Sequence, residues 1–496
     1  MIDKRKFSKI ARCLLFLLVF IIAFLFCNKI FILKRNDGIV PMQNLYAQKK
    51  NAVDILVCGP SLAGELGMDE LWYDYGIAGY NLWGSVEPFW NCYFVLKEAL
   101  KCQKPKVVIL EVSPASFKYE YQDNARQLCN TQGMKFGKNF LDAIRVSAPK
   151  ERYLELLFGI RTFHSRFKEL SRDDFLHFNW INDCNIYKGG FQSYHENAKM
   201  DMTDFSNVIE VKGIHPKEEK YLRLFIELCQ QKNISVLLIK SPSVKSRVAG
   251  LPYYNYISKI ADEYGINFID TNKLYDEIGF EVDDAADVSH INIRGMWKLT
   301  SYIGSVLRNE YGISDRREEK KYSSYEKYTE KCHQKHIEGL KGKKGYEAEV
   351  LRSNQKPYVD LNVPIYFGSN NYNAPVYVRC GLSEHDKDFS WTDGKFMRMI
   401  CNFPKSCVGK NLKATYHLAQ VFNGKQKVIV YVNNRRIFDK ELSNSEDLEF
   451  YFTLPTDTIT AHIMIEFPNA VSPKTLGFAE DNKELALAIK NVVFSE

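Results

Sequence analysis

The sequence has few of the features that mark a metal site. It contains twelve cysteines, but no set of Cys and His residues has the spacing of a zinc site. Cys332, His333 and His336 lie in a stretch rich in Lys and Glu, which we expect to be a solvated helix surface. Neither a metal nor a cofactor is therefore predicted. The cysteines leave two alternatives open, disulfides formed in an oxidising compartment or thiols that stay reduced.

The net positive charge is confined to two short segments. The formal net charge is +7. Residues 1–12 carry five Lys or Arg against one Asp, and residues 315–344 carry ten against six Asp or Glu, so each segment contributes +4. The remainder of the chain is close to neutral, which argues against a nucleic-acid-binding surface.

The N-terminus lacks the small-x-small pattern of a signal-peptide cleavage site. Residues 13–27 are uncharged and follow the basic segment 1–12, and Lys29 precedes four more apolar residues. Because a lysine side chain can reach the membrane interface, residues 13–34 are long enough to cross a bilayer. We therefore expect a retained single-pass anchor, with a cleaved signal peptide as the alternative. In both cases residues 1–12 are cytoplasmic and the bulk of the chain is extracytoplasmic, periplasmic or at the cell surface.

Residues 50–311 alternate between apolar strands and helices, and a chain of 496 residues is long enough for two or three domains. We expect strands at residues 54–57, 80–82, 106–112, 234–239 and 266–269, and helices at residues 88–101, 216–232, 254–264 and 294–310. This alternation predicts an α/β fold, a parallel sheet with helices on both faces. Residues 114–214 interrupt the pattern, and we expect them to form an insertion or cap over the sheet edge.

The character of the chain changes after residue 311. Residues 312–356 are highly charged, and we expect a linker helix or spacer there. Residues 357–496 contain short strands separated by Asn, Gly, Asp and Pro turns, and Val428, Val430 and Val432 alternate so that they share one face. The expected strands are residues 376–380, 396–402, 412–422, 427–432, 448–454 and 459–467. The pattern predicts an all-β sandwich.

A serine and an Asp-x-x-His motif stand at opposite ends of the α/β region. Ser61 follows the first strand at a Gly-Pro turn, so its hydroxyl is expected at the carboxyl end of the sheet, where open α/β sheets bind ligands. A serine hydroxyl needs a base within hydrogen-bond reach to act as a nucleophile. His290 is the expected base, and Asp287, three residues earlier, is expected to orient its ring.

Three donors are candidates for an oxyanion hole: the N–H groups of Leu62 and Gly84 and the side chain of Asn81. Each feature of the site also has a simpler explanation. A Gly-Pro-Ser turn after a strand is common, and Asp287 could cap the helix that follows His290, as could Ser289 or Asn292. The order of the motifs, with the serine after the first strand and Asp-x-x-His before the last helix, favours the catalytic interpretation.

This order resembles the SGNH (GDSL-type) hydrolase superfamily. More narrowly, residues 52–310 resemble its membrane-anchored branch that acts on cell-envelope polymers, which includes alginate O-acetyltransferase-like proteins and the D protein of teichoic-acid D-alanylation. The resemblance implies a flavodoxin-like sheet, Ser61 as nucleophile, Asp287 and His290 as its partners, and Gly84 in the second oxyanion block. The matching stretches are residues 55–61, Leu71-Trp72, Tyr75-Gly76-Ile77, Tyr80-Asn81-Leu82, residues 104–110, Phe268-Ile269-Asp270 and residues 287–292.

The chain departs from that superfamily in two motifs. Gly-Pro-Ser-Leu replaces the usual Gly-Asp-Ser, and Glu111-Val112-Ser113 stands where these hydrolases carry Gly-x-Asn-Asp. The missing Asn removes one oxyanion donor. A catalytically degenerate protein that binds polysaccharide or serves as a scaffold in an export complex is therefore the alternative.

The β region resembles the jelly-roll modules appended to bacterial polysaccharide-biosynthesis enzymes. The likeness is carried by Gly381-Leu382-Ser383-Glu384, Trp391-Thr392-Asp393-Gly394 and Ser472-Pro473. It makes this region a candidate carbohydrate-binding module, in which Trp391 stacks on a sugar ring and Asp393 binds its hydroxyls. The alternative places Trp391 in the core and Asp393-Gly394 in a hairpin turn.

Together these features predict a membrane-anchored, extracytoplasmic serine esterase or O-acyltransferase. We expect an acetyl group as the acyl group and a cell-surface polysaccharide as the substrate. Acyl transfer requires a donor on the same side of the membrane, so a multi-span membrane acyltransferase is the expected partner.

Overall fold

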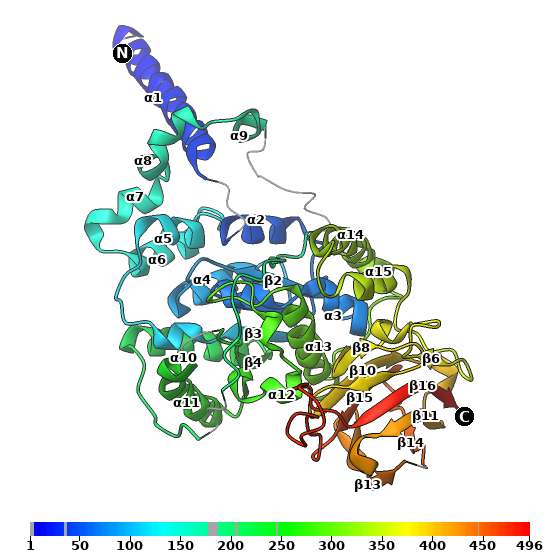
Figure 1. Cartoon of the computed structure of the whole chain (residues 1–496). Coiled ribbons are helices and arrows are strands. Elements are labelled where there is room, and N and C mark those ends of the chain that lie inside the picture. Colours follow the sequence, from blue (N-terminus) through cyan, green and yellow to red (C-terminus); the bar gives the residue numbers. More distant parts are fainter. Residues whose placement is uncertain (1–3, 34–36, 177–186, 204–206, 245–246, 445) are drawn as a thin grey trace.

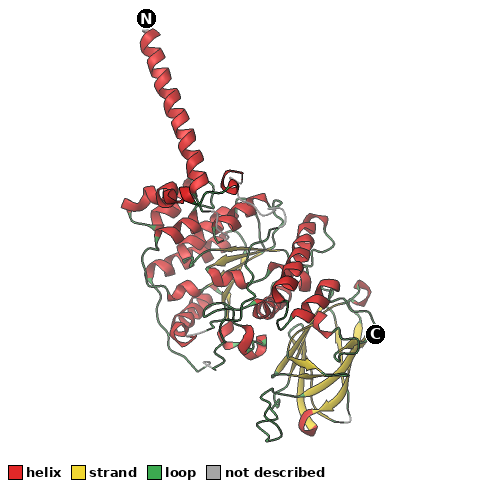
Figure 2. Cartoon of the chain, turned by 45° about the horizontal axis from the view of Figure 1, so that its top comes forward, coloured by secondary structure: helices red, strands yellow, loops and turns green. Residues whose placement is uncertain are grey.

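The chain forms an N-terminal helix, an α/β domain and a β-sandwich (Figure 1). The computed structural model describes residues 4–33, 37–176, 187–203, 207–244, 247–444 and 446–496. The N-terminal helix projects from one end of the α/β domain and the sandwich lies at the other end (Figures 1 and 2). The predicted fold class, a parallel sheet covered by helices and followed by an antiparallel sandwich, is confirmed.

The α/β domain is built on a five-stranded parallel sheet in the order β2-β1-β3-β4-β5. Ile55 pairs with Gly79 on one side and with Val107 on the other, so β1 lies between β2 and β3. Chain order therefore reverses between β1 and β3, and such switch points are where open α/β sheets bind ligands. The strands are β1 (Ile55–Gly59), β2 (Gly79–Trp83), β3 (Val107–Glu111), β4 (Ser235–Lys240) and β5 (Asn267–Asp270).

Helices cover both faces because successive strand residues point to opposite sides. Leu56 and Cys58 join one core, with residues of α2, α4, α10 and α11. Ile55 and Val57 join the other, with residues of α3, α12 and α13. The bounds are α2 (Ile39–Ala47), α3 (Met68–Tyr75), α4 (Phe89–Ala99), α10 (Pro216–Gln231), α11 (Arg247–Tyr264), α12 (Tyr275–Ile278) and α13 (Ile293–Asn309).

The N-terminal helix α1 (Lys4–Phe31) is long and apolar. Within the 24 residues Ser8–Phe31, an 18-residue window has a mean hydropathy of 2.9, and this window is not buried against the rest of the protein. The helix is therefore long and apolar enough to cross a membrane, a property that single-pass anchors and signal sequences share.

The segment expected to cap the sheet forms two separate structures. Its first part forms short helices: those within residues 124–147 pack on α2 and α4, and those within residues 160–176 contact α1 (Figure 1). Its second part, residues 187–200, which we call the strap, follows the β2 edge. Asn81 N–H donates to the Lys188 carbonyl at 2.8 Å, and Phe191 N–H donates to the Gly64 carbonyl at 3.2 Å. The helices are α5 (Asn124–Thr131), α6 (Lys138–Ser147), α7 (Tyr153–Leu157), α8 (Ile160–Phe163) and α9 (Arg172–Leu176).

The charged stretch after the α/β domain forms two packed helices, α14 (Ser323–Leu340) and α15 (Tyr346–Asn354). Cys332 is 4% exposed and His336 is 1% exposed, so the prediction of a solvated surface is wrong for both. His336 Nε2 bonds Asp69 of α3 at 2.8 Å. High charge describes only the outer face of α14, whereas its inner face packs on the α/β domain. Among the described residues no cluster that could hold a metal ion is found, and the eleven described cysteines are free thiols.

The C-terminal domain consists of two antiparallel sheets packed face to face. One has the order β13-β12-β15-β10-β7, and the other has the order β14-β11-β16-β9-β8 with β6 paired to β16. Val428, Val430 and Val432 are all buried, as their alternation predicts. The strands are β6 (Ile365–Tyr366), β7 (Val378–Cys380), β8 (Leu382–His385), β9 (Ser390–Thr392), β10 (Phe396–Asn402), β11 (Asn411–Val421), β12 (Lys425–Val432), β13 (Arg435–Ser443), β14 (Leu448–Thr453), β15 (Thr460–Glu466) and β16 (Leu487–Ser495).

A buried ion cluster joins the sandwich to the α/β domain. Arg379 of β7 bonds the Asp74 carboxylate of α3 with its Nε at 3.0 Å, and Glu70 lies 3.3 Å from the same nitrogen. All three side chains are almost fully buried. Moving the domains apart would separate these partners and leave an uncompensated buried charge, which is costly. The cluster therefore holds the two domains in one relative position.

Candidate active site

Ser61 stands at the carboxyl end of β1, at the switch point of the sheet. Gly59 ends the strand with a φ of 146°, and a Cβ atom there would lie only 2.8 Å from the Glu111 side chain of β3. Only glycine fits that close approach without strain. Pro60 then leads into a 3₁₀ turn, Ser61–Glu65, which we call the serine turn. The Ser61 hydroxyl is thus presented at the rim of the sheet.

The structure brings Ser61, His290 and Asp287 together although 229 positions separate the serine from the histidine. His290 Nε2 lies 2.9 Å from Ser61 Oγ. The other ring nitrogen, Nδ1, lies 3.1 Å from both carboxylate oxygens of Asp287. These contacts have the lengths of ordinary hydrogen bonds and form one continuous chain from hydroxyl to carboxylate.

The Asp287 carboxylate fixes the tautomer of the His290 ring. A carboxylate only accepts hydrogen bonds, so Nδ1 carries the proton and Nε2 is left to accept from the Ser61 hydroxyl. Partial burial opposes the ionisation of Asp287, but the Ser289 N–H and the His290 ring outweigh it and lower the pKa of Asp287 below its ordinary value. The arrangement is that of a nucleophile, a general base and an orienting acid.

The cap of the following helix is Asn292 and not Asp287. The Asn292 side chain accepts the N–H groups of Arg294 at 3.1 Å and Gly295 at 3.3 Å at the start of α13. The carboxylate of Asp287 instead bonds the His290 ring and the backbone N–H groups of Ser289 and His290. The helix-cap explanation for Asp287 is therefore wrong.

Two residues that the sequence interpretation missed support His290. Glu65, at the end of the serine turn, accepts the Ile291 N–H at 3.0 Å. Phe191 of the strap sets its ring against the His290 ring at a centroid distance of 5.6 Å and an interplanar angle of 89°. Glu65 is fully buried, and this burial raises its pKa well above the ordinary value, which favours the neutral carboxylic acid. Neither contact has a signal in the sequence, because both join segments far apart in the chain.

The structure corrects two of the three expected oxyanion donors. The Gly84 N–H donates to the Gly59 carbonyl at 3.0 Å. The Asn81 side chain is fully buried and donates to the Ala63 carbonyl at 2.7 Å, so it braces the serine turn from inside. Both groups are thus engaged in holding the turn. For the Leu62 N–H, by contrast, no acceptor is found among the described residues, and it stands in the first turn after Ser61.

The Glu111-Val112-Ser113 motif, which replaces Gly-x-Asn-Asp, has a structural function. Glu111 is fully buried and accepts the backbone N–H of Ser113 at 2.9 Å and its hydroxyl at 2.7 Å. Lys240 Nζ lies 3.6 Å from the same carboxylate, and the Ser241 N–H donates to it at 3.2 Å. This network ties the ends of β3 and β4 together and leaves Glu111 facing the interior rather than the site.

Trp391 and Asp393 do not form one sugar platform. Trp391 is half-buried, with its ring packed edge-on against Phe389 and Phe422. Asp393 lines a different place, a cavity of about 530 Å³ between the two domains that Trp391 does not line. The expected hairpin is also wrong, because Asp393-Gly394 connects β9 of one sheet to β10 of the other. The turn therefore carries the chain across the sandwich.

The chain was compared with known proteins. It matches no protein-family model and no curated protein. Among solved structures, a two-domain esterase active on acetylated mannans aligns with 92% of this chain and 95% of its own, at 11% identity and a TM-score of 0.21. Family 35 carbohydrate-binding modules from an environmental isolate and from Clostridium thermocellum align with 28% and 26% of this chain and 81% and 97% of theirs, at 10% and 7% identity and TM-scores of 0.16 and 0.17. At these scores the likeness carries no functional argument, so function has to be argued from the site itself.

Proposed function

We propose that this protein is an extracytoplasmic serine esterase or O-acyltransferase that acts on acetyl esters of a cell-surface polysaccharide. The observation that carries the proposal is the unbroken chain from Ser61 Oγ to His290 Nε2 at 2.9 Å and from His290 Nδ1 to Asp287 at 3.1 Å. Three groups of these types have this order and spacing in enzymes that use a serine nucleophile.

The chemistry runs in two steps at these atoms. Ser61 Oγ attacks the ester carbonyl while its proton passes to His290 Nε2, and Asp287 stabilises the imidazolium that forms. The sugar hydroxyl leaves with that proton, and the acyl group stays on Ser61 as an ester. His290 then removes a proton from water or from another sugar hydroxyl, which takes the acyl group. The Leu62 N–H is the proposed donor to the oxyanion in both steps.

An open site suits a polymeric substrate. Ser61 lies partly exposed on the rim, the His290 side chain is 25% exposed, and Asp287 is 52% exposed. At an open rim, a hydroxyl and an imidazole can reach an acetyl group that projects from the middle of a long polymer. The site does not have to enclose the end of that polymer. These exposures support a polysaccharide over a small ester that needs full burial.

The packing round α1 supports a retained anchor over a cleaved signal peptide. Asn28 accepts the Ile160 N–H at 2.9 Å, Arg166 donates to the Phe31 carbonyl at 2.7 Å, and Phe24 packs against Phe158 at a centroid distance of 5.0 Å. Ile30 is 3% exposed. A cleaved signal sequence does not need contacts with the folded domain, and its loss would leave these groups without partners.

A non-catalytic, polysaccharide-binding scaffold is the second candidate. The Gly84 N–H is engaged by the Gly59 carbonyl and the Asn81 side chain by the serine turn, which favours this candidate, because an oxyanion hole with one donor stabilises the intermediate less. Removing one donor from such a hole typically costs about 10²- to 10³-fold in rate. The two candidates differ in whether Ser61 turns over an ester.

Release of acetate from O-acetylated polysaccharide by the full chain tests the proposal. We expect Ser61→Ala to abolish the release and Ser369→Ala, an exposed serine of the sandwich, to leave it unchanged. Equal release by Ser61→Ala and the parent would reject the enzyme. The mass of the protein extracted from membranes tests the anchor: we expect α1 to be present, and a product that begins after residue 31 would reject the anchor.

A further inference from the structure

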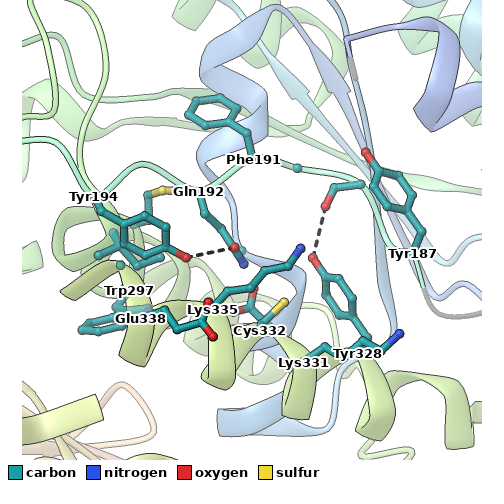
Figure 3. Close-up of a pocket in the computed structure, with 17 residues that line it drawn as sticks. Tyr187, Phe191, Gln192, Tyr194, Trp297, Tyr328, Lys331, Cys332, Lys335 and Glu338 are labelled. Carbon is teal, nitrogen blue, oxygen red and sulfur yellow. Dashed lines mark hydrogen bonds between the residues drawn. The ribbon is translucent and has the colours of Figure 1, made fainter. Parts of the chain in front are cut away.

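A cavity of about 910 Å³ is lined by the strap, and Ser61 is not among its lining residues. Its walls are the strap, α14, and the first turns of α3 and α13 (Figure 3). Phe191 belongs to both places, since it lines the cavity and its ring packs against His290. A ligand in the cavity would therefore extend to within one aromatic ring of the general base.

Aromatic side chains line this cavity from three elements of the fold. Tyr187, Phe191 and Tyr194 come from the strap, Trp297 from α13 and Tyr328 from α14. Apart from the buried Trp297, these rings are partly exposed. Rings of this kind stack on the apolar faces of sugar rings while their polar edges bind hydroxyls. The lining is thus suited to a carbohydrate.

Hydrogen bonds hold two of these rings in place. Tyr194 Oη lies 3.0 Å from His336 Nδ1, and the same His336 is anchored by Asp69. Tyr328 Oη donates to the Gly189 carbonyl at 3.2 Å (Figure 3). Tyr187 Oη, by contrast, is buried and has no hydrogen-bond partner among the described residues. Rings fixed before a ligand arrives lose little conformational freedom on binding.

The exposed charge on the lining is mainly positive. Lys331 and Lys335, one turn apart on α14, line the cavity, and Lys335 reaches from α14 toward the strap (Figure 3). Among the described residues of the lining, the acids are Glu338, which is exposed, and Asp69, which is buried against His336. Two lysines on one helix face attract a ligand that carries carboxylates or phosphates.

From these observations we infer that the cavity between the strap and α14 is a binding groove for an acidic glycan chain, which it presents to Ser61. The inference rests on the proposed function, and it specifies the substrate class of the same site: an acetylated polysaccharide that carries negative charge. Lys331 and Lys335 bind the charged groups, and the aromatic rings contact the sugar faces. Phe191 marks the end of the groove beside the reacting ester.

Kinetics of the full chain on three substrates test this groove. The substrates are O-acetylated polygalacturonate, which is acidic, O-acetylated glucomannan, which is neutral, and 4-nitrophenyl acetate. We expect the double variant Lys331→Ala, Lys335→Ala to raise KM about tenfold or more on the acidic polymer, and to leave turnover of 4-nitrophenyl acetate unchanged. Lys341→Ala, an exposed lysine just after α14 that does not line the cavity, is the matched control. An unchanged KM on the acidic polymer would overturn the inference.

Binding measurements separate this inference from the catalytic proposal. Full-chain Ser61→Ala cannot turn over the ester, so its affinity for deacetylated polygalacturonate, measured by affinity electrophoresis, depends on the groove alone. We expect binding that weakens with added salt and that weakens further in Tyr194→Ala, with Tyr451→Ala on the sandwich as the exposed aromatic control. Equal binding of the neutral polymer, or binding unaffected by the lysine and Tyr194 variants, would reject an acidic-glycan groove even if Ser61 is catalytic.

Discussion

Glu65 Oε1 accepts the Ile291 N–H at 3.0 Å, and this bond joins two segments 226 positions apart. Glu65 ends the serine turn, and Ile291 directly follows His290. The distance between the nucleophile and its base therefore depends on a buried side chain that touches neither the serine nor the imidazole. We regard Glu65 as a positioning residue.

Replacing Glu65 tests that role. Burial raises the pKa of Glu65 well above its ordinary value and so favours the neutral acid, and an amide oxygen can accept the same N–H in its place. We expect Glu65→Gln to keep kcat close to that of the parent. Glu65→Ala leaves the Ile291 N–H without its acceptor, and we expect kcat on 4-nitrophenyl acetate to fall about tenfold or more with little change in KM.

The comparison of these two variants is the control. A purely structural role would lower thermal stability in both and leave the kcat of the folded fraction unchanged. If Glu65→Gln lost as much kcat as Glu65→Ala, the neutral-acceptor account of Glu65 would be wrong.

Asp287→Asn tests the orientation of the imidazole. An amide nitrogen in place of a carboxylate oxygen can donate to Nδ1, which favours the tautomer with the proton on Nε2 and leaves no acceptor for the Ser61 hydroxyl. We expect kcat to fall at least about a hundredfold, measured by acetate release. Asp283→Asn is the matched control, because this exposed acid four positions earlier pairs with Lys199 and lies outside the hydrogen-bonded chain. A loss of the same size in both variants would mean that the whole loop had moved.

His462 makes the stability of the fold depend on pH. Burial in β15, together with the charge of Arg398, lowers the pKa of His462 to about 3. Between about pH 6.5 and 3 the unfolded chain therefore binds a proton that the native chain does not. The contribution of this group to the free energy of unfolding is complete above pH 6.5 and is lost, by about 1.4 kcal/mol per pH unit, as the pH falls toward 3.

Urea unfolding at pH 4 to 7 measures this effect. We expect the free energy of unfolding of His462→Phe to decline less steeply with acid than that of the parent, whatever its value at pH 7. Parallel curves for the parent and His462→Phe would show that His462 is protonated in the native state.

Local pattern was enough to predict the framework of the fold. The β-branched run of β3 and the prolines that start α4 and α10, Pro88 and Pro216, define their elements without tertiary information. Strand β13 escaped prediction because most of its residues are exposed and show no burial alternation. The composition of α14 predicts a helix, but its high content of Lys and Glu hides the buried face formed by Tyr, Cys and His.

The candidate site was only partly predictable. Ser61, Asp287 and His290 were found because a Gly-Pro turn after a strand and an Asp-x-x-His turn before a helix are local signals. The oxyanion donors were not, since whether the Gly84 N–H is free depends on the Gly59 carbonyl of a neighbouring strand. Glu65 and Phe191 act through contacts between distant segments, which no single stretch of sequence reveals.

Covalent labelling with an active-site fluorophosphonate tests the central claim most directly, because the reagent reacts with a serine hydroxyl only where a neighbouring base has made it nucleophilic. The full chain is treated and digested, and the modified peptide is identified by mass. An activated serine predicts one adduct, on Ser61, that disappears in Ser61→Ala and falls sharply in His290→Ala. A parent protein that carries no adduct on Ser61, or one that His290→Ala leaves undiminished, would contradict an imidazole-activated nucleophile.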